Sequence, residues 1–175
     1  MLQIRQKFEL LDMLKKQKED LDAEILKYTA TYEDEISIMV SVSGVSILMA
    51  LCFKADYADI TRFSNAKRFC SYMRSAPKVQ SSNDTVLIGH INKASRRRSL
   101  SLLLQGLRHV HSTEGRMKEF RERKIKGKSK GKVRIALARK VFVAIYHMVK
   151  NKELYNEMNE LNYFRKLEEV KKLVA

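Results

Sequence analysis

Helix breakers are scarce in this chain, which has one proline and six glycines in 175 residues. Proline and glycine are the residues that most often interrupt a helix, so their scarcity leaves long uninterrupted windows. Most of these windows repeat apolar residues every three or four positions, and no strand pattern competes seriously with that spacing. The sequence therefore predicts an all-α or mainly α fold, arranged as a helical bundle.

The first predicted helix runs from Ile4 to about Ala30 and is amphipathic. Its apolar positions follow a heptad-like spacing, interrupted by Lys18, at Ile4, Leu11, Leu14, Leu21 and Ile25. This spacing is typical of a coiled-coil helix, which needs a second apolar surface. Two interpretations stay open: the helix packs on its own domain, or it pairs with another chain.

Two apolar helices are predicted between Glu35 and Phe53, joined by a turn at Gly44 that resembles a helix-hairpin-helix turn. Asp59 or Thr61 is then expected to cap a helix that continues through Tyr72.

The rest of the chain alternates helices with polar segments. The stretch 80–85 is predicted to be a loop, and helices are expected over about 97–109 and over 133–150. A flexible basic hinge is expected between them at 124–132. We therefore predict an N-terminal coiled-coil-like helix (1–32), a helical domain (33–152) and a C-terminal amphipathic helix (153–175).

Positive charge is the strongest compositional signal. Lysine and arginine number 35 against 20 aspartates and glutamates, which gives a formal net charge of +15 and favours a polyanionic partner such as DNA. Between Arg116 and Lys140, twelve basic residues occur with two acidic ones, a local balance of +10. Such a segment is expected to hold nucleic acid through phosphate contacts that weaken steeply with salt.

Several other classes of protein are not expected. The longest apolar run, 36–53, is broken by serines and a glycine, and no signal-peptide pattern opens the chain, so we expect a cytoplasmic protein without membrane contact. Cys52 and Cys70 form no CxxC pair and have no histidines at ligand spacing. Neither a disulfide framework nor a metal site is predicted, and no cofactor is expected in this chain.

Six short phrases occur in a characteristic order between Ile36 and Lys152. They are Val42-Ser43-Gly44-Val45-Ser46, Arg62-Phe63-Ser64-Asn65-Ala66-Lys67, Ser71-Tyr72 to Pro77, Ser81-Ser82-Asn83, Gly89-His90-Ile91-Asn92-Lys93 and Ala136-Leu137-Ala138-Arg139-Lys140. In this order they resemble the C-terminal domain of the insertion-sequence transposases numbered 110, 116 and 902. The chain departs from the family pattern at Ser43, Gly44 and Asn83, and it has a basic run, 94–98, where a Gly-Asn pair is usual.

The resemblance implies a role in DNA transposition, in which two domains jointly cut and rejoin DNA under the guidance of an RNA encoded by the element. A serine of the C-terminal domain would form the covalent link to DNA, and Ser82 best occupies its position, with Ser81 as the rival. Magnesium would be bound by an N-terminal ribonuclease-H-like domain, which we expect this chain to lack. The family also implies a homo-oligomer or an association with full-length transposase. The alternative is a non-catalytic nucleic-acid-binding fragment, or an inhibitor that dimerises with intact transposase.

The candidate nucleic-acid contacts are of two kinds. Backbone N–H groups at the turn around Gly44 can hold a phosphate without reading sequence. Arginine and lysine side chains near the serine loop and along the basic segment can neutralise phosphates. The predicted set is Gly44, Arg74, Lys78, Lys93, Arg96, Arg97, Arg98, Lys124, Lys126, Lys128, Lys130, Lys132, Arg139 and Lys140.

Overall fold

The computed structural model describes residues 2–82, 85–91, 98–110 and 115–174. Within these residues the chain forms eight α-helices, one short 3-10 helix and one two-stranded antiparallel sheet. The mainly α fold predicted from the scarcity of helix breakers is confirmed.

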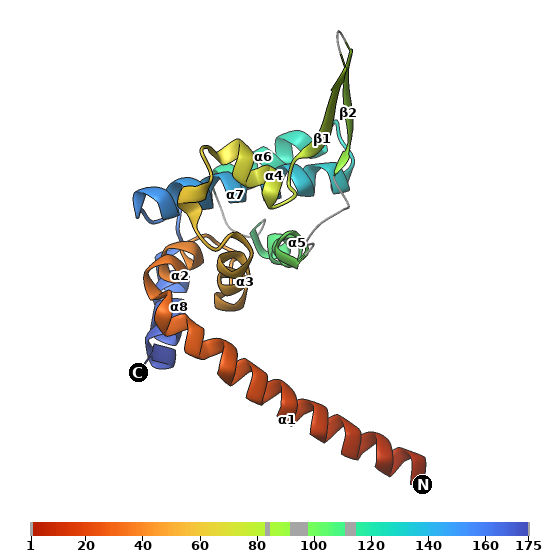
Figure 1. Ribbon diagram of the computed structural model, residues 1–175, viewed down its shortest axis with the longest axis vertical. Helices are drawn as coiled ribbons and strands as arrows, with labels where there is room; N and C mark the ends of the chain where they lie inside the picture. Colours follow the sequence, from red (N-terminus) through yellow and green to blue (C-terminus); the bar gives the residue numbers. More distant parts are fainter. Residues whose placement is uncertain (1, 83–84, 92–97, 111–114, 175) are drawn as a thin grey trace.

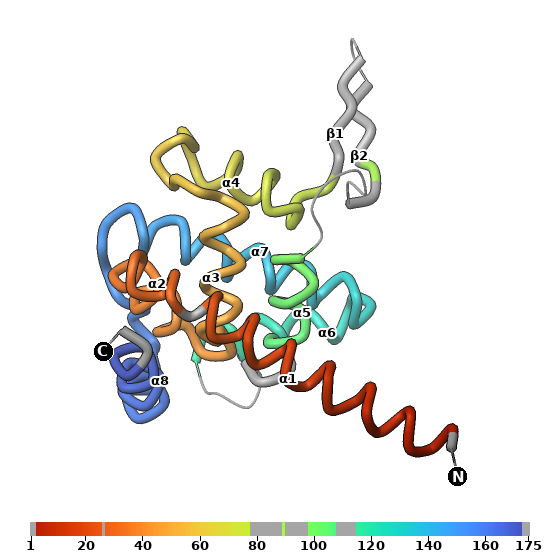
Figure 2. Tube along the Cα trace, turned by 60° about the horizontal axis from the view of Figure 1, so that its bottom comes forward, coloured from red at the N-terminus to blue at the C-terminus, as the bar shows by residue number. Residues whose placement is uncertain are grey.

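The first helix, α1 (Leu2–Thr31), extends away from the helical body, with the N-terminus at its far end (Figures 1 and 2). Its heptad-spaced side chains Ile4 and Leu21 are each more than 60% exposed. Only the C-terminal part of α1 contacts the body, where it meets α2 and α8. The long N-terminal helix is confirmed, and its pairing as a coiled coil stays a prediction.

The predicted pair of apolar helices is present as α2 (Glu33–Val40) and α3 (Ile47–Tyr57). Gly44 lies in the turn between them with a φ of +85°, a conformation that glycine adopts without a steric penalty. The Ser46 side chain accepts a hydrogen bond from the Met49 backbone N–H and caps the start of α3. The turn therefore lies where the glycine and serines predict it.

The single helix expected from Asp59 to Tyr72 is divided in two. Asp59 caps only the 3-10 helix η1 (Ile60–Arg62), after which Phe63 adopts an extended conformation. Asn65 then starts α4 (Ala66–Tyr72) by accepting a hydrogen bond from the Arg68 N–H. The second cap explains the division, since a side chain that caps a new helix requires the preceding helix to have ended.

The prediction of a loop at 80–85 is wrong for residues 80–82 and for Thr85, which belong to strands, while residues 83 and 84 lie outside the described residues. Strands β1 (Pro77–Ser82) and β2 (Thr85–Ile91) form an antiparallel hairpin that projects from the helical body (Figure 1). In its register Val79 pairs with Ile88 and Ser82 pairs with Thr85. Backbone hydrogen bonds hold such a ribbon, so its polar residues do not need the strict alternation that marks a half-buried strand.

The remaining helices are α5 (Arg98–Val110), α6 (Arg116–Ile125), α7 (Lys130–Asn151) and α8 (Glu160–Val174). Helices α5, α7 and α8 correspond to predicted helical segments, whereas α6 was not predicted. The flexible hinge expected at 124–132 is wrong in extent. Helix α6 occupies its start and α7 its end, so only the four residues 126–129 form the turn.

The core surrounds α7, which packs against α2, α4, α5 and α6. Phe142 of α7 makes edge-to-face ring contacts with Phe53 and Phe69, with centroids 5.5 Å and 6.2 Å apart. Tyr163 and Val170 of α8 belong to the same buried cluster. Helix α8 thus contributes directly to the core on which the rest of the domain is built.

Candidate nucleic-acid interface

The most basic surface follows α6, the turn 126–129 and the first half of α7, and we call residues 116–140 the α6–α7 basic segment. Four of its lysines are exposed in and beside the turn, and they are Lys126, Lys128, Lys130 and Lys132. These four lysines do not share one helix face, because two of them lie in the turn 126–129 and two lie at the start of α7. The turn instead gathers cations from two helix ends at one place.

Helix electrostatics at this turn favour an anion. Lys130 and Lys132 lie in the first turn of α7, which contains no acidic residue and whose N-cap Ser129 makes no side-chain capping bond. The N-terminus of a helix already carries a partial positive charge, so two lysines there repel it. A phosphate group beside this turn would reduce that repulsion and accept hydrogen bonds from the first N–H groups of the helix.

Other cations of the segment have partners within the protein. The Arg134 guanidinium donates to the Leu104 carbonyl oxygen over 2.7 Å, which ties α7 to α5. The Lys140 ammonium lies 4.6 Å from the centre of the Phe120 ring, a cation–π contact between α7 and α6. Arg139 is half-buried, whereas Lys140 is exposed. The segment therefore combines cations that position its helices with cations that face solvent.

The turn between α2 and α3 is held from two sides. The Lys166 ammonium of α8 donates hydrogen bonds to the carbonyl oxygens of Val40 and Val45, over 3.0 Å and 2.7 Å. On α5, a Cβ added to Gly106 would lie 2.3 Å from the Gly44 carbonyl oxygen, so only glycine permits this approach. These contacts hold the Gly44 turn in place. The sequence predicted the turn, but it did not predict the contacts that Lys166 and Gly106 make with it.

The C-terminal region also reaches this turn through Ser41. The Ser41 hydroxyl accepts a hydrogen bond from the Tyr155 N–H over 3.0 Å and donates one to the Ile38 carbonyl oxygen. A cavity of about 520 Å³ opens beside the turn, and Asn159, Asn162 and Arg165 contribute to its wall. Donor groups from α8 and its N-terminal flank thus stand next to the Gly44 turn.

We expect Lys166→Met to reduce the free energy of unfolding by roughly 2–4 kcal/mol, because two buried carbonyl oxygens would lose a charged donor. Lys166 is half-buried, and this burial lowers the pKa of its ammonium. Urea denaturation followed by circular dichroism measures the change. Lys171→Met, at an exposed position of the same helix, is the control and should alter stability by less than about 0.5 kcal/mol. Equal stability of the two variants would contradict the bracing role.

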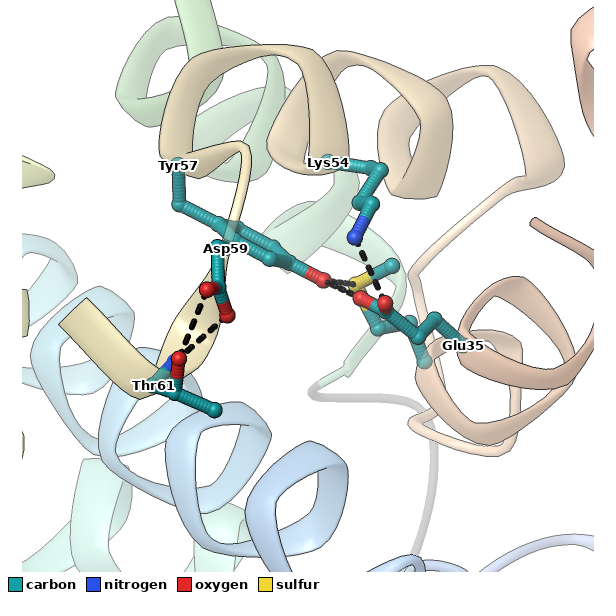
Figure 3. Close-up of polar contacts among 6 residues, drawn as sticks. Glu35, Lys54, Tyr57, Asp59 and Thr61 are labelled. Carbon is teal, nitrogen blue, oxygen red and sulfur yellow. Dashed lines mark hydrogen bonds and ion pairs between the residues drawn. The ribbon is translucent and has the colours of Figure 1, made fainter. Parts of the chain in front are cut away.

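A polar network also joins α2 to α3 (Figure 3). The Glu35 carboxylate accepts hydrogen bonds from the Lys54 ammonium and the Tyr57 hydroxyl, each over 2.5 Å. Burial, followed by the hydrogen bond to Glu35, raises the pKa of the Tyr57 hydroxyl far above its usual range. Tyr57 therefore keeps its proton as a donor, and the network braces the two helices that flank the Gly44 turn.

The structure describes three of the predicted cations near Ser81 and Ser82, and they belong to different parts of the chain. Arg74, which has a φ of +61°, is only 3% exposed, so its side chain does not face solvent. Arg98 is exposed at the first residue of α5 and lines a cavity with Cys52 and Tyr28. Lys78 belongs to β1, together with Ser81 and Ser82. Three further predicted contacts lie outside the described residues, namely Lys93, Arg96 and Arg97.

No group of three or more metal-ligating side chains occurs in the described part of the chain. Cys52 and Cys70 are free, and burial raises the pKa of both thiols. None of the helices in the described ranges has the length and apolar character that crossing a membrane requires.

A comparison with protein families matches residues 37–122 to the family described as Transposase IS116/IS110/IS902. The matched segment begins in α2 and ends in α6, so it includes the Gly44 turn, the β-hairpin and α5. A search of curated proteins found no match to the chain.

Proposed function

We propose that this chain, whose residues 37–122 match the IS116/IS110/IS902 transposase family, is the DNA-handling region of a transposase. In this proposal the α6–α7 basic segment holds the phosphate backbone of nucleic acid. The observation that carries it is the concentration of charge, since a +10 balance lies within 25 residues of a chain whose total is +15. The phosphates of a nucleic-acid backbone are the anions that such a surface can bind without reading sequence.

The turn between α2 and α3 supports a second phosphate contact. Its carbonyl oxygens at Val40 and Val45 are already occupied by Lys166, while Ser46 at the start of α3 is exposed. Backbone N–H groups at a helix start bind phosphate oxygens readily. We propose that α5 and α8 hold this turn rigid so that its N–H groups meet a DNA backbone.

We further propose that strand cleavage and exchange use Ser82, with Ser81 as the alternative nucleophile. Ser82 is the last residue of β1 and pairs with Thr85, so both serines lie near the end of a projecting hairpin. A serine hydroxyl needs activation by a base, a metal or a positive field before it attacks a phosphodiester. The proposal assigns that activation to the complete transposase, including a magnesium-binding domain, and guide RNA and further copies of the chain are its expected partners.

The test is the salt dependence of binding to labelled duplex DNA and to structured RNA. We expect a linear fall of log affinity with log salt concentration. Substitution of glutamine at Lys126, Lys128, Lys130 and Lys132 should make the slope shallower by up to about 3.6 for duplex DNA, since each lost phosphate contact removes about 0.9. Fluorescence anisotropy at salt concentrations from about 50 to 300 mM measures this slope.

The matched control places four glutamines at exposed lysines outside the segment, which are Lys7, Lys16, Lys171 and Lys172. Both variants lose the same net charge, so a local interface predicts a large effect only for the first. An equal fall of affinity in both would mean that overall charge, not the α6–α7 basic segment, drives binding. No binding at low salt would reject the proposed function.

A further inference from the structure

A small pocket opens where α5, α6 and α7 meet, inside the α6–α7 basic segment. Its volume is about 210 Å³. Leu107, Val133 and Leu137 are buried and form its floor, and half-buried Ile125 contributes from the end of α6. The pocket is therefore apolar at its base, although the segment around it is the most basic part of the chain.

Three cations surround this apolar floor, and they are Arg121, Lys130 and Arg134. Arg134 is held in place by its hydrogen bond to the Leu104 carbonyl oxygen, so its planar guanidinium does not have to be ordered when a ligand binds. Lys130 is exposed in the first turn of α7. A ligand that fits must therefore combine an apolar portion with nearby negative charge.

We propose that this pocket receives one unpaired nucleobase while the surrounding cations hold the phosphates that flank it. The inference rests on the proposed function, because it assumes that nucleic acid binds the α6–α7 basic segment. A base in a paired duplex is stacked and covered, whereas a bulged or single-stranded base can leave the stack and enter a pocket. Arginine planes and apolar side chains are the surfaces on which such bases pack.

The volume of the pocket favours a ligand as small as one nucleobase. Small-molecule sites usually occupy about 300–1,000 Å³, and this pocket is smaller than that range. It is nevertheless several times larger than the roughly 30 Å³ that one water molecule occupies in the liquid. The charge around it continues along the exposed lysines of the turn 126–129, so a strand that places a base here also meets cations on either side.

Two probes differing in one base test the inference. A labelled duplex with one bulged adenine is compared with the same duplex carrying an abasic unit at the bulge. We expect the whole chain to bind the adenine probe about tenfold more tightly, because packing of one base contributes to affinity on that order. A bulged 2-aminopurine gives an independent fluorescence readout with the unmodified chain, which contains no tryptophan.

The decisive variant is Ile125→Trp, which fills the pocket without changing charge. It should remove the preference for the adenine bulge while leaving the affinity for fully paired duplex and its salt slope unchanged. Ile125→Ala, which leaves the pocket open, should retain a measurable preference and shows whether the site tolerates substitution. Circular dichroism and thermal melting confirm that both variants fold.

The outcomes separate the two proposals. Equal binding of adenine and abasic probes by the unmodified chain, with a steep salt slope, would overturn the base pocket and leave nucleic-acid binding intact. A preference that survives in folded Ile125→Trp would also overturn it. Absence of salt-dependent binding to any probe would reject both the pocket and the proposed function.

Discussion

Replacement of Gly106 by alanine should reduce the free energy of unfolding by about 3 kcal/mol, at the upper end of typical overpacking costs. The added Cβ would lie 2.3 Å from the Gly44 carbonyl oxygen and 3.0 Å from the Met49 methyl carbon. The Met49 side chain can move, but the Gly44 oxygen is backbone in a turn that Lys166 and α3 hold in place. Helix α5 must therefore shift away from the turn, which opens the core along its length.

The direction of the change in the free energy of unfolding distinguishes a crowded glycine from an unconstrained one. Alanine is the better helix former by about 1 kcal/mol, so an unconstrained helical glycine should gain stability on substitution. Gly131 in α7 provides that control, because nothing lies within 4 Å of an added Cβ there. We expect Gly131→Ala to stabilise the protein slightly while Gly106→Ala destabilises it, as measured by urea denaturation. If both substitutions stabilised the protein, the close contact between α5 and the Gly44 turn would be wrong.

The same contact should affect function. If the Gly44 turn binds a phosphate, Gly106→Ala must also weaken DNA binding at temperatures where the variant remains folded, since the turn would no longer be held in one conformation. The glutamine variant at the four lysines acts on charge alone and should leave stability nearly unchanged. The two variants thus separate the shape of the interface from its electrostatics.

Local periodicity was sufficient for most helices because their signals are contained within the segment itself. The heptad-like spacing predicted α1, and the apolar circumference of the 133–150 segment predicted the central helix α7. The β-hairpin could not be found in this way. Its polar stretch carries the composition of a loop, and strand pairing depends on register with a partner rather than on the residues of one strand.

The candidate interface also combines features that the local sequence predicts with features that depend on distant residues. The charge of the α6–α7 basic segment is visible in the composition, but its compact turn depends on where two helices end. The contacts of Lys166 span more than 120 residues, from α8 to the turn between α2 and α3. Such a pairing leaves no local pattern. The burial of Arg74 has the same cause, since arginine is usually exposed and only the surrounding fold withdraws it.

The largest functional effect is expected from Ser82→Ala in a complete transposase that carries this region. Strand cleavage should fall by at least about 10³-fold, because a methyl group cannot form the covalent link to phosphorus that a serine nucleophile forms. The measurement is the rate of DNA cleavage, together with capture of the protein–DNA adduct on a denaturing gel. Binding of DNA by this chain should remain unchanged, since the α6–α7 basic segment is untouched.

Ser81→Ala is the matched control, because both serines belong to β1 and pair with neighbouring residues of β2. Loss of the adduct only in Ser82→Ala would assign the nucleophile to the residue at the end of the strand. Loss only in Ser81→Ala would move it one residue inward, to the position paired with Val86. An adduct that persists in the double variant would exclude serine chemistry from the hairpin. The hairpin would then be a structural projection, and the contribution of this region to transposition would be to hold nucleic acid.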